Sequence, residues 1–544
     1  MFFDENSIIC TRTNITIPNT MRLTLLIFSL LFSLTAFSQN WSDDVAEIFY
    51  NKCTKCHHTG GVGPFPLTTY SEASPLAAVI YDAVNLDEMP PWPPNNDYQT
   101  YSHDRSLSVS EKTTVLNWIT NGALEGTAAN TPPPPVYAAG SVLGNGDLEL
   151  QIPTYMSKAT AGADDYVCFA LPSNLATTRN IKAVEIVPGN RQIVHHALIY
   201  IDPTGTSVTD TVGGDCGGPS SPTASLVMGY TPGSSPMTLP SASPLKLGIP
   251  FPANSQVVFA MHYPEGSYGE FDSTKVIFHF YPPGETGIRD VSATAVLQNW
   301  SFALPANQIT DVTAQYPASG GLGLNFSLLS VFPHMHLLGQ KMKVFGIDSN
   351  LDTLNLIDVP RWDFEWQDFY FYKNIQKAEI GTTLYAEATY DNTSGNINNP
   401  NSPPAWVLPG LNTTDEMLLV YMHYMLYQNG DENYNIDSLM SLGFSSITNN
   451  TFGEGLFTVY PNPTDGIVNL YSKNLSAGDV ISVDIYNTQG QRVRNLLETM
   501  KLSDEELHIQ WDGNNNSGYA VGSGLYFISI NVNGEFSHQR VMKR

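Results

Sequence analysis

The chain has 544 residues and a formal net charge of −26. This length exceeds what one hydrophobic core supports, so we expect about three to four domains. The acidic balance excludes a nucleic-acid partner, which requires a basic surface. Few charged residues (14%) with 42 Gly and 37 Pro are typical of an exported, β-rich protein.

Residues 1–38 predict a leader that is removed on export. From Met21, one basic residue and a short apolar run are followed by small residues near Ser38, as in a secretory signal peptide. Residues 1–20 are interpreted as an upstream mis-start. The run is too short to cross a membrane, so no transmembrane span is expected in the mature protein. No Cys follows the run, which argues against a lipid anchor.

Residues 39–127 predict a small all-α domain with one covalently bound c-type haem. Amphipathic helical patterns flank a Cys-x-x-Cys-His motif made of Cys53, Cys56 and His57. In this motif two thiols bond the haem edge and the His ligates the iron from one face. The same Cys pair could instead bind zinc. The segment resembles a small cytochrome c domain.

The second axial iron ligand should lie on a loop some tens of residues later. Met89 is the first choice, because Met is a common partner of His in cytochromes c and raises the potential. The alternative interpretation of Met89 is a core residue. His58 and His103 are weaker candidate ligands. A Pro-rich linker, residues 128–146, follows the domain.

From residue 147 the pattern changes to the two-residue period of strands closed by Pro and Gly turns. About 300 residues of this kind suffice for two β-sandwiches. A break near residues 282–292 divides them into domains 147–290 and 291–447. Residues 455–544 are again β-rich. The expected fold class is therefore mainly β, with one small α-domain in front.

The cysteines can be assigned in turn. Cys10 lies in the leader, and Cys53 and Cys56 belong to the haem motif. Cys168 and Cys216 remain as an even pair, for which export predicts a disulfide.

Six side chains predict two unequal copper sites: His195, His196, His262, His334, His336 and Met417. Imidazole and thioether donors without thiolate suit copper better than zinc or iron, and the thioether favours Cu(I). The His-x-His pair would point to one face of a strand. The adjacent His-His pair can reach one ion only at a bulge, at a strand end, or through a different ring nitrogen. Taken singly, each of these residues is more often structural.

The sequence around these ligands resembles the copper type II, ascorbate-dependent monooxygenases, which include the peptidylglycine α-hydroxylating and dopamine β-monooxygenases. The shared motifs are His-His-Ala-Leu, Met-His-Tyr, Pro-His-Met-His-Leu-Leu-Gly and Thr-Asp-Glu-Met, within residues 147–445. The resemblance implies two jelly-roll-like β-sandwiches that face each other across a solvent-filled cleft. It also implies that Cys168 pairs with a Cys near Cys216.

The resemblance also implies a role for each ligand set. His195, His196 and His262 would hold the copper that stores and passes an electron. His334, His336 and Met417 would hold the copper that binds dioxygen and abstracts hydrogen from a substrate C–H bond. A site with only three protein ligands keeps a coordination position open for dioxygen.

Two positions depart from the peptide-amidating members. Phe332 stands where those enzymes have an Arg that grips the substrate carboxylate, and Ala260 replaces a Gln. Tyr421, four residues after Met417, is retained among the catalytic residues. The resemblance therefore supports the chemistry more than a peptidyl-glycine substrate.

The sequence as a whole predicts an exported copper-dependent monooxygenase that hydroxylates a small-molecule or peptide substrate with dioxygen. Its cofactors would be two copper ions and one c-type haem, with electrons from ascorbate, from the haem, or from both. The alternative is a non-catalytic electron-transfer or copper-binding surface protein on the same scaffold. A structural or adhesive secreted protein is the weaker third reading.

The last ninety residues resemble the type A sorting domain of the type IX secretion system. The similarity rests on blocks at residues 459–466, 483–490 and 522–527 and on the basic end Lys543-Arg544. It implies a Bacteroidetes-like Gram-negative host, passage through the periplasm, and the secretion machinery as a partner. The expected location is the cell surface or the medium, with the sorting domain removed.

Overall fold

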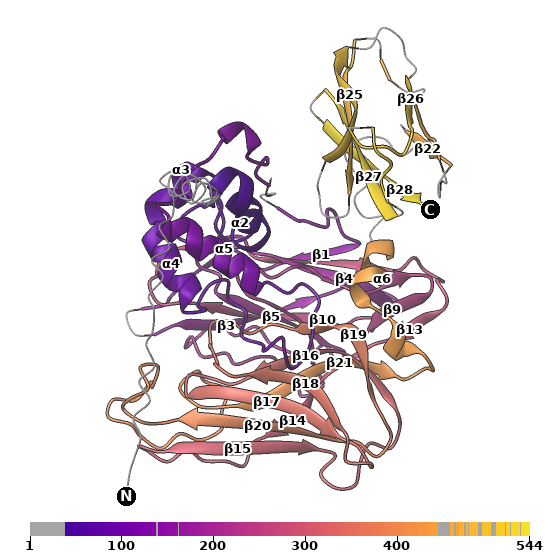
Figure 1. Ribbon diagram of the computed structural model, residues 1–544. Coiled ribbons are helices and arrows are strands. Elements are labelled where there is room, and N and C mark those ends of the chain that lie inside the picture. Colours follow the sequence, from indigo (N-terminus) through magenta and orange to yellow (C-terminus); the bar gives the residue numbers. More distant parts are fainter. Residues whose placement is uncertain are drawn as a thin grey trace, which may run out of the picture. The chain divides into compact units, whose positions relative to one another are not determined.

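The computed structural model describes residues 39–443 and 457–544, apart from 136, 138–139, 161–162, 462–463, 465, 473–474, 477, 488–491, 502–506, 517, 523 and 534. The predicted leader and Cys10 lie outside the described residues. Strands make up 41% and helices 11% of the structure, so the predicted mainly β class is confirmed (Figure 1). Among the described residues, no helix has both the length and the apolar character that crossing a membrane requires.

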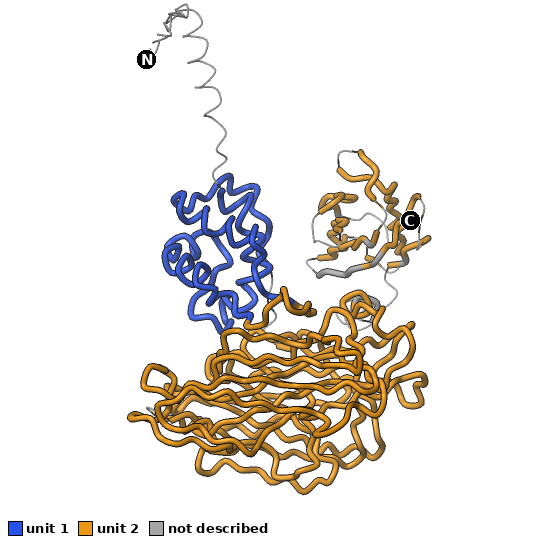
Figure 2. The backbone as a smooth tube through the Cα atoms, turned by 60° about the horizontal axis from the view of Figure 1, so that its bottom comes forward, with its two compact units in different colours: residues 1–92, 104–137 blue, residues 93–103, 138–544 orange. Residues whose placement is uncertain are grey.

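The chain divides into two compact units, one of residues 1–92 and 104–137 and the other of residues 93–103 and 138–544 (Figure 2). The first unit is helical, and its elements are η1 (Trp41–Val45), α2 (Ala46–Lys52), α3 (Tyr70–Ala73), η2 (Ser74–Leu76), α4 (Ala77–Asn85), α5 (Val109–Thr120) and η3 (Ala128–Asn130). Thr69 and Ser108 start α3 and α5 with capping boxes. Trp41, Phe49 and Trp118 pack edge to face or tilted in its core, with ring centroids 5.0–6.0 Å apart.

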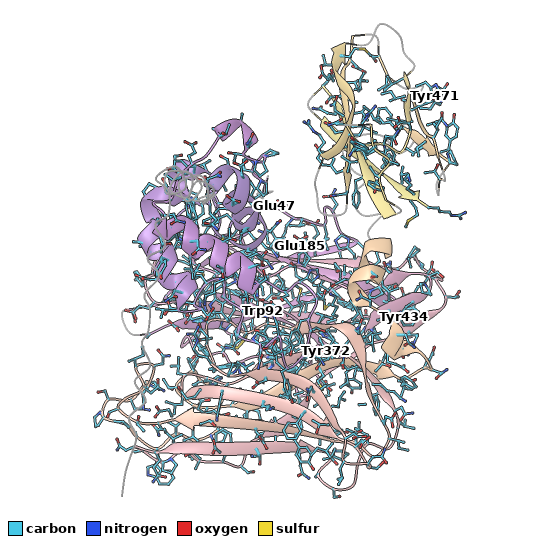
Figure 3. The ribbon with its side chains drawn as sticks, viewed as in Figure 1. Glu47, Trp92, Glu185, Tyr372, Tyr434 and Tyr471 are labelled. Atoms are coloured by element: carbon cyan, nitrogen blue, oxygen red, sulfur yellow. A yellow bond between two sulfur atoms is a disulfide. The ribbon has the colours of Figure 1, made fainter. Side chains whose placement is uncertain are left out.

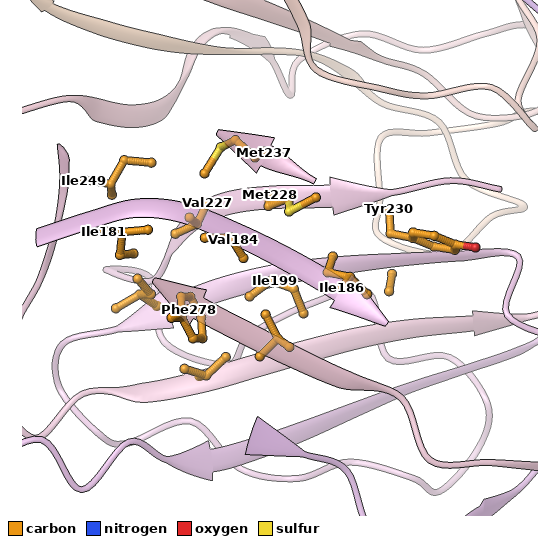
Figure 4. Close-up of a cluster of buried hydrophobic side chains, with 14 of the residues drawn as sticks. Ile181, Val184, Ile186, Ile199, Val227, Met228, Tyr230, Met237, Ile249 and Phe278 are labelled. Carbon is orange, nitrogen blue, oxygen red and sulfur yellow. The ribbon is translucent and has the colours of Figure 1, made fainter. Parts of the chain in front are cut away.

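The first β-sandwich of the second unit pairs two sheets. The larger sheet contains β1 (Leu148–Gln151), β12 (Lys275–Phe280), β4 (Arg179–Val187), β9 (Leu245–Phe251) and β13 (Ile288–Asp290), joined by β7 (Met237–Thr238) and β8 (Ser241–Ala242). The other sheet has the order β3 (Asp165–Pro172), β10 (Gln256–Tyr263), β5 (His196–Asp202), β6 (Ser225–Tyr230), and β2 (Tyr155–Met156) pairs with β11 (Phe271–Asp272). Apolar residues of both sheets meet in one core, such as Val184 and Phe278 from the larger sheet and Ile199 from the smaller (Figure 4).

The second β-sandwich follows directly. One sheet has the order β14 (Ser292–Asn299), β21 (Leu418–Leu426), β16 (Phe326–His334), β19 (Tyr370–Ala378), and the other β15 (Ile309–Tyr316), β20 (Thr383–Asp391), β17 (Gly339–Ile347), β18 (Thr353–Val359). The turn η4 (Asp431–Asn433) and helix α6 (Ile436–Gly443) come after β21. The chain passes from the first sandwich to the second at Val291, between β13 and β14.

The two sandwiches pack against each other through their inner sheets. A buried cluster joins Tyr200 and Val258 of the first sandwich to Phe332 and Phe369 of the second. The fully buried His423 also donates through Nε2 to the carbonyl of Val227, at 3.1 Å. The sheets that carry the predicted ligands are thus held face to face.

The segment 93–103 belongs to this second unit, although its flanks belong to the helical one. Tyr101 donates its hydroxyl to the carbonyl of Leu356 at 3.0 Å, and the N–H of Ser102 bonds the carbonyl of Phe371 at 2.7 Å. Tyr101 also stacks on the fully buried Tyr372 (labelled in Figure 3), with ring centroids 5.9 Å apart.

The C-terminal segment forms the predicted third β-sandwich. Its sheets are β22 (Thr458–Tyr460), β23 (Val468–Ser472), β26 (Leu507–Trp511), and β25 (Arg492–Lys501), β24 (Val480–Asn487), β27 (Gly524–Val532), β28 (Glu535–Lys543). Leu470 and Trp511 of the first sheet share a core with Ile485 and Ile528 of the second.

Candidate metal centres

Strand register brings the first three histidines together. His262 of β10 lies directly opposite His196 of β5. His195 precedes the first residue of β5, and its N–H bonds the carbonyl of His262 at 3.1 Å. The strict alternation of side chains does not yet apply at this strand end, so both members of the adjacent pair reach one point. The strand-end alternative proposed from the sequence is the geometry that the structure has.

The three imidazole rings all direct their Nδ1 atoms towards one another. The Nδ1 atoms of His195, His196 and His262 lie 3.1–3.2 Å apart in all three pairs. The centre of a triangle of this size is about 1.8 Å from each corner, close to the 2.0–2.1 Å of a metal–imidazole bond. The three donors therefore fit a single metal ion.

Burial keeps these imidazoles neutral. Desolvation, with repulsion from His262, lowers the pKa of His195 to about 4, and burial also lowers the pKa values of His196 and His262. On the far side of the rings, Nε2 of His262 donates to Asp164 at 2.9 Å and Nε2 of His195 contacts Glu365. A carboxylate accepts a hydrogen bond from a nitrogen that carries a proton. In His195 and His262, Nε2 therefore carries the hydrogen, and Nδ1 keeps its lone pair for a metal.

The second ligand set lies at the matching end of the inner sheet of the second sandwich. His334 ends β16 and lies opposite Leu419 of β21, while Met417 immediately precedes β21. The rings of His334 and His336 have centroids 5.1 Å apart. The antiparallel register therefore explains why a Met some eighty residues further along the chain lies at the same sheet end as the His-x-His pair.

The outward nitrogens of this pair are also occupied. Nδ1 of His334 meets the side-chain oxygen of Gln367, and Nδ1 of His336 donates to the carbonyl of Asp415 at 3.1 Å. Each leaves Nε2 free for a metal. Burial lowers the pKa of His334 to about 3 and that of His336 to about 4, so both are neutral at pH 7.

Glu416 connects the two parts of this second set. Its fully buried carboxylate accepts the N–H groups of His336 (3.0 Å), Leu338 (2.6 Å) and Met417 (3.2 Å). Burial raises its pKa to about 8, against the effect of these donors. Glu416 thus fixes the loop after β16 relative to the residue that starts β21.

A segment between β18 and β19, residues 360–369, contacts both ligand sets. The ring centroid of Phe364 lies 6.1 Å from that of His196 and 6.1 Å from that of His336. The same segment supplies Glu365 to His195 and Gln367 to His334. Sequence analysis missed these residues, because no spacing rule relates them to either His group.

One cavity of about 360 Å³ between the inner sheets is lined by residues of both ligand sets, without His195. Its lining includes His196, His262, His334, His336 and Met417. The disulfide Cys168–Cys216, with Cα atoms 5.8 Å apart, forms as expected and places Cys216 in the cavity wall.

Tyr421 lines the same cavity, opposite Phe332 in the β16–β21 register. Its hydroxyl hydrogen-bonds that of Tyr200, which comes from β5 of the first sandwich. The retained Tyr therefore contacts the opposite domain within the cavity.

The predicted haem residues lie in the helical unit. Cys53 and Cys56 are free thiols directly after α2. Nδ1 of His57 donates to the carbonyl of Phe65 at 3.0 Å, which leaves Nε2 for an iron ion. A Cβ on Gly63 would lie 2.6 Å from the His57 ring, so Gly63 allows the ring to take this orientation. These features fit a c-type haem.

The candidates for the second axial ligand differ in their surroundings. The side chain of Met89 is 39% exposed and therefore not a core residue. His58 donates through Nδ1 to the carbonyl of Thr54 at 2.8 Å and stacks on Tyr137 at 4.0 Å. His103 falls in the segment that belongs to the other unit. Met89 stays the preferred prediction.

Comparison with protein families identifies two domains in the chain. Residues 307–450 match the copper type II ascorbate-dependent monooxygenase, C-terminal domain. Residues 458–544 match the secretion system C-terminal sorting domain. The chain thus carries a C-terminal domain of this monooxygenase family and ends in a sorting domain. That domain directs export by the type IX system of Bacteroidetes to the cell surface or beyond.

Solved structures show only distant likeness. The type IX secretion surface component PorZ of Porphyromonas gingivalis is 25% identical over 16% of this chain and 11% of its own, with a TM-score of 0.12. Dimeric latent PorU of the same organism is 10% identical over 70% of this chain and 33% of its own, with a TM-score of 0.14. The chain spans less than half the length of either protein. No curated protein matches the chain.

Proposed function

We propose that the protein is an exported copper-dependent monooxygenase that hydroxylates a substrate C–H bond with dioxygen. The observation that carries this proposal is a pair of unequal donor sets, three imidazoles that lie together and two imidazoles with a thioether, both of which contribute residues to one cavity. The overall reaction would consume one dioxygen, two electrons and two protons per substrate and yield the alcohol and water. Copper bound at the two sets would supply the electron transfer and the dioxygen activation.

Residues of the chain would prepare this chemistry in specific ways. Asp164 and Gln367 each orient one His, in the first and second set respectively. Glu416 joins the loop that carries His336 to the residue Met417. Phe364 packs against rings of both sets. His334, His336 and Met417 would present the reacting position, with Tyr421 beside it.

Oxygen uptake and product formation with ascorbate test this proposal. The wild-type protein should bind about two copper ions per chain and form a product that contains one atom from dioxygen. Met417→Ala should lose most of this activity, because the thioether stabilises the reduced metal. Met425→Ala, in the same strand but outside the cavity, serves as the matched control.

Equal activity in the wild type and Met417→Ala would contradict the assigned ligand. Copper bound without any oxygen-dependent product would favour the non-catalytic electron-transfer protein instead.

We further propose that residues 39–127 bind one c-type haem through Cys53, Cys56 and His57 and that this haem can replace or supplement ascorbate. Met89→Ala should lower the reduction potential of the haem, because Met ligation raises it. Met156→Ala, at another exposed Met, should leave the potential unchanged. An unchanged potential in Met89→Ala would exclude Met89.

The electron path has its own test. Reduced protein is mixed with oxygen and substrate, and the haem spectrum is followed during the reaction. Haem that stays reduced while product forms would exclude it as the electron donor.

A further inference from the structure

In its described residues, the cavity between the ligand sets has a wall without acidic or strongly basic side chains. Among the described residues that line it, none is Asp, Glu, Lys or Arg. Its apolar wall consists mainly of Leu198, Ala260, Trp300, Phe332, Leu411 and Leu419. The chain's own Asp, Glu, Lys and Arg side chains therefore place no charge on this surface.

The nearest carboxylates do not add charge to the cavity wall. Asp164 and Glu365 lie against the outward Nε2 atoms of His262 and His195 and are not part of the wall. A charged group that entered the cavity would lose its hydration without finding an ion-pair partner on the chain, which is costly.

Part of the wall consists of packed aromatic rings. Phe332 is 1% exposed, and its ring centroid lies 4.8 Å from that of Phe369 and 6.0 Å from that of Tyr421. No cation can reach this position from a neighbouring side chain of the wall, since the wall has none.

Besides the imidazoles, four hydroxyl-bearing residues interrupt the apolar surface: Tyr166, Tyr200, Thr413 and Tyr421. The hydroxyls of Tyr200 and Tyr421 bond each other within the wall. A bonded hydroxyl pair uses one of its two hydrogens, so the other can be donated to a third group. Such a pair suits a neutral partner, such as a hydroxyl, ether or carbonyl.

We infer that the cavity binds an uncharged small molecule with an apolar body and one neutral polar group directed to the Tyr200–Tyr421 pair. The inference rests on the proposed function and names its substrate class. The cavity volume of about 360 Å³ lies at the small end for ligand sites, which favours a small molecule over an extended peptide. Molecules that carry a carboxylate or an ammonium group near the reacting carbon are disfavoured.

The test compares three probes of one carbon skeleton: 4-phenylbutan-1-ol, 4-phenylbutanoate and 4-phenylbutylammonium. Their binding to the full, copper-loaded chain is measured calorimetrically at pH 7, without oxygen and with ascorbate present. Under these conditions copper is held as Cu(I), which has little preference for carboxylate oxygen, and no turnover occurs. The alcohol should bind at least about tenfold more tightly than either charged probe.

Variants locate the binding. Leu411 lines the cavity and is 57% exposed, so Leu411→Lys introduces a cation without disturbing a core. It should raise the affinity for the carboxylate at least about tenfold, whereas the matched neutral variant Leu411→Gln should not. Tyr421→Phe should weaken binding of the alcohol several-fold and leave that of butylbenzene unchanged. Phe332→Arg should act like Leu411→Lys if it folds.

Three results would overturn the inference: a charged probe that binds wild type as tightly as the alcohol, an alcohol that does not bind, or probe selectivity unaffected by Leu411→Lys. These results are independent of catalysis. If the binding pattern holds but no substrate yields an oxygen-dependent product, the proposed function fails instead.

Discussion

At the scale of single residues, Glu416 has the greatest structural effect on the candidate sites. One carboxylate satisfies three buried N–H groups from two chain segments, and both segments carry ligands of the second set. Such a group positions ligands without contacting a metal itself. Its fully buried position makes any replacement costly.

Glu416→Ala should lower the free energy of unfolding by about 3 kcal/mol, because each unsatisfied buried N–H costs about 1–3 kcal/mol and water can restore part of this loss. Copper should be lost from the second set before the first. Urea unfolding and copper content measure the two effects. Glu379→Ala, at a half-exposed carboxylate, is the control and should change neither. Simultaneous loss of both coppers would argue against a local positioning role.

A second residue-scale prediction separates the two sets. Gln367→Ala should weaken copper binding at the His334 set by about 10–100-fold, because it removes the partner of the outward ring nitrogen. Asp164→Asn should have the same effect on the His262 set only. Competition with a chelator of known affinity measures both. If either variant weakened copper binding at both sets, the idea that each set is oriented by its own partner would be contradicted.

At the scale of elements, the site illustrates what sequence patterns can and cannot predict. The convergence of the His195–His196 pair with His262 follows from geometry at a strand end. The expectation that both members of the His-x-His pair lie on one face of a strand was wrong, because β16 ends at His334 and His336 lies in the loop after it. The contacts of Phe364 could not be predicted, because they depend on how the segment after β18 folds across a domain interface. No periodicity encodes such a path.

The same limit applies to domain organisation. The mainly β class follows from the two-residue period and from Pro and Gly turns. The assignment of residues 93–103 to the β-rich unit does not, because its short loop pattern resembles any surface connection. Its hydrogen bonds to the strands β18 and β19 are tertiary contacts without a local signal.

The disulfide gives an element-scale prediction. It closes a loop with a sequence separation of 48 residues, and removing such a link costs about 4 kcal/mol in the chain-entropy estimate. The double variant Cys168→Ser, Cys216→Ser should therefore unfold at lower urea concentration. It should also bind the neutral probe less tightly, because Cys216 is part of the cavity wall. Unchanged probe affinity in the folded variant would show that the disulfide does not shape the cavity.

At the scale of the whole molecule, buried titratable groups determine how the metal-free protein responds to pH. The pKa values of His195, His334 and His336 are lowered from 6.5 to about 4 or about 3. Between these values and 6.5 the unfolded chain binds more protons, so stability falls as the pH drops. Glu365 and Glu416 act in the opposite sense, because burial raises their pKa values from 4.5 to about 7 and about 8.

The metal-free protein should therefore be most stable near pH 6.5. Below that pH the buried histidines outnumber the two glutamates and stability decreases by a few kcal/mol towards pH 4.5. Above it the raised pKa values of Glu365 and Glu416 make stability decrease again towards pH 8. Urea unfolding across pH 4.5–8 measures this curve. A free energy of unfolding that rises continuously to pH 8 would contradict the raised glutamate pKa values.

The segment 93–103 has a consequence for how the chain responds to cleavage. The chain leaves the helical unit after Trp92, enters the β-rich unit, and returns at Asp104 before the Pro-rich linker. A protease that cuts the linker would therefore produce a fragment that still contains a stretch hydrogen-bonded to β18 and β19. The nicked protein should migrate as two bands under denaturing conditions and as one particle under native conditions. The helical unit would thus stay connected to the β-rich unit even after such a cut.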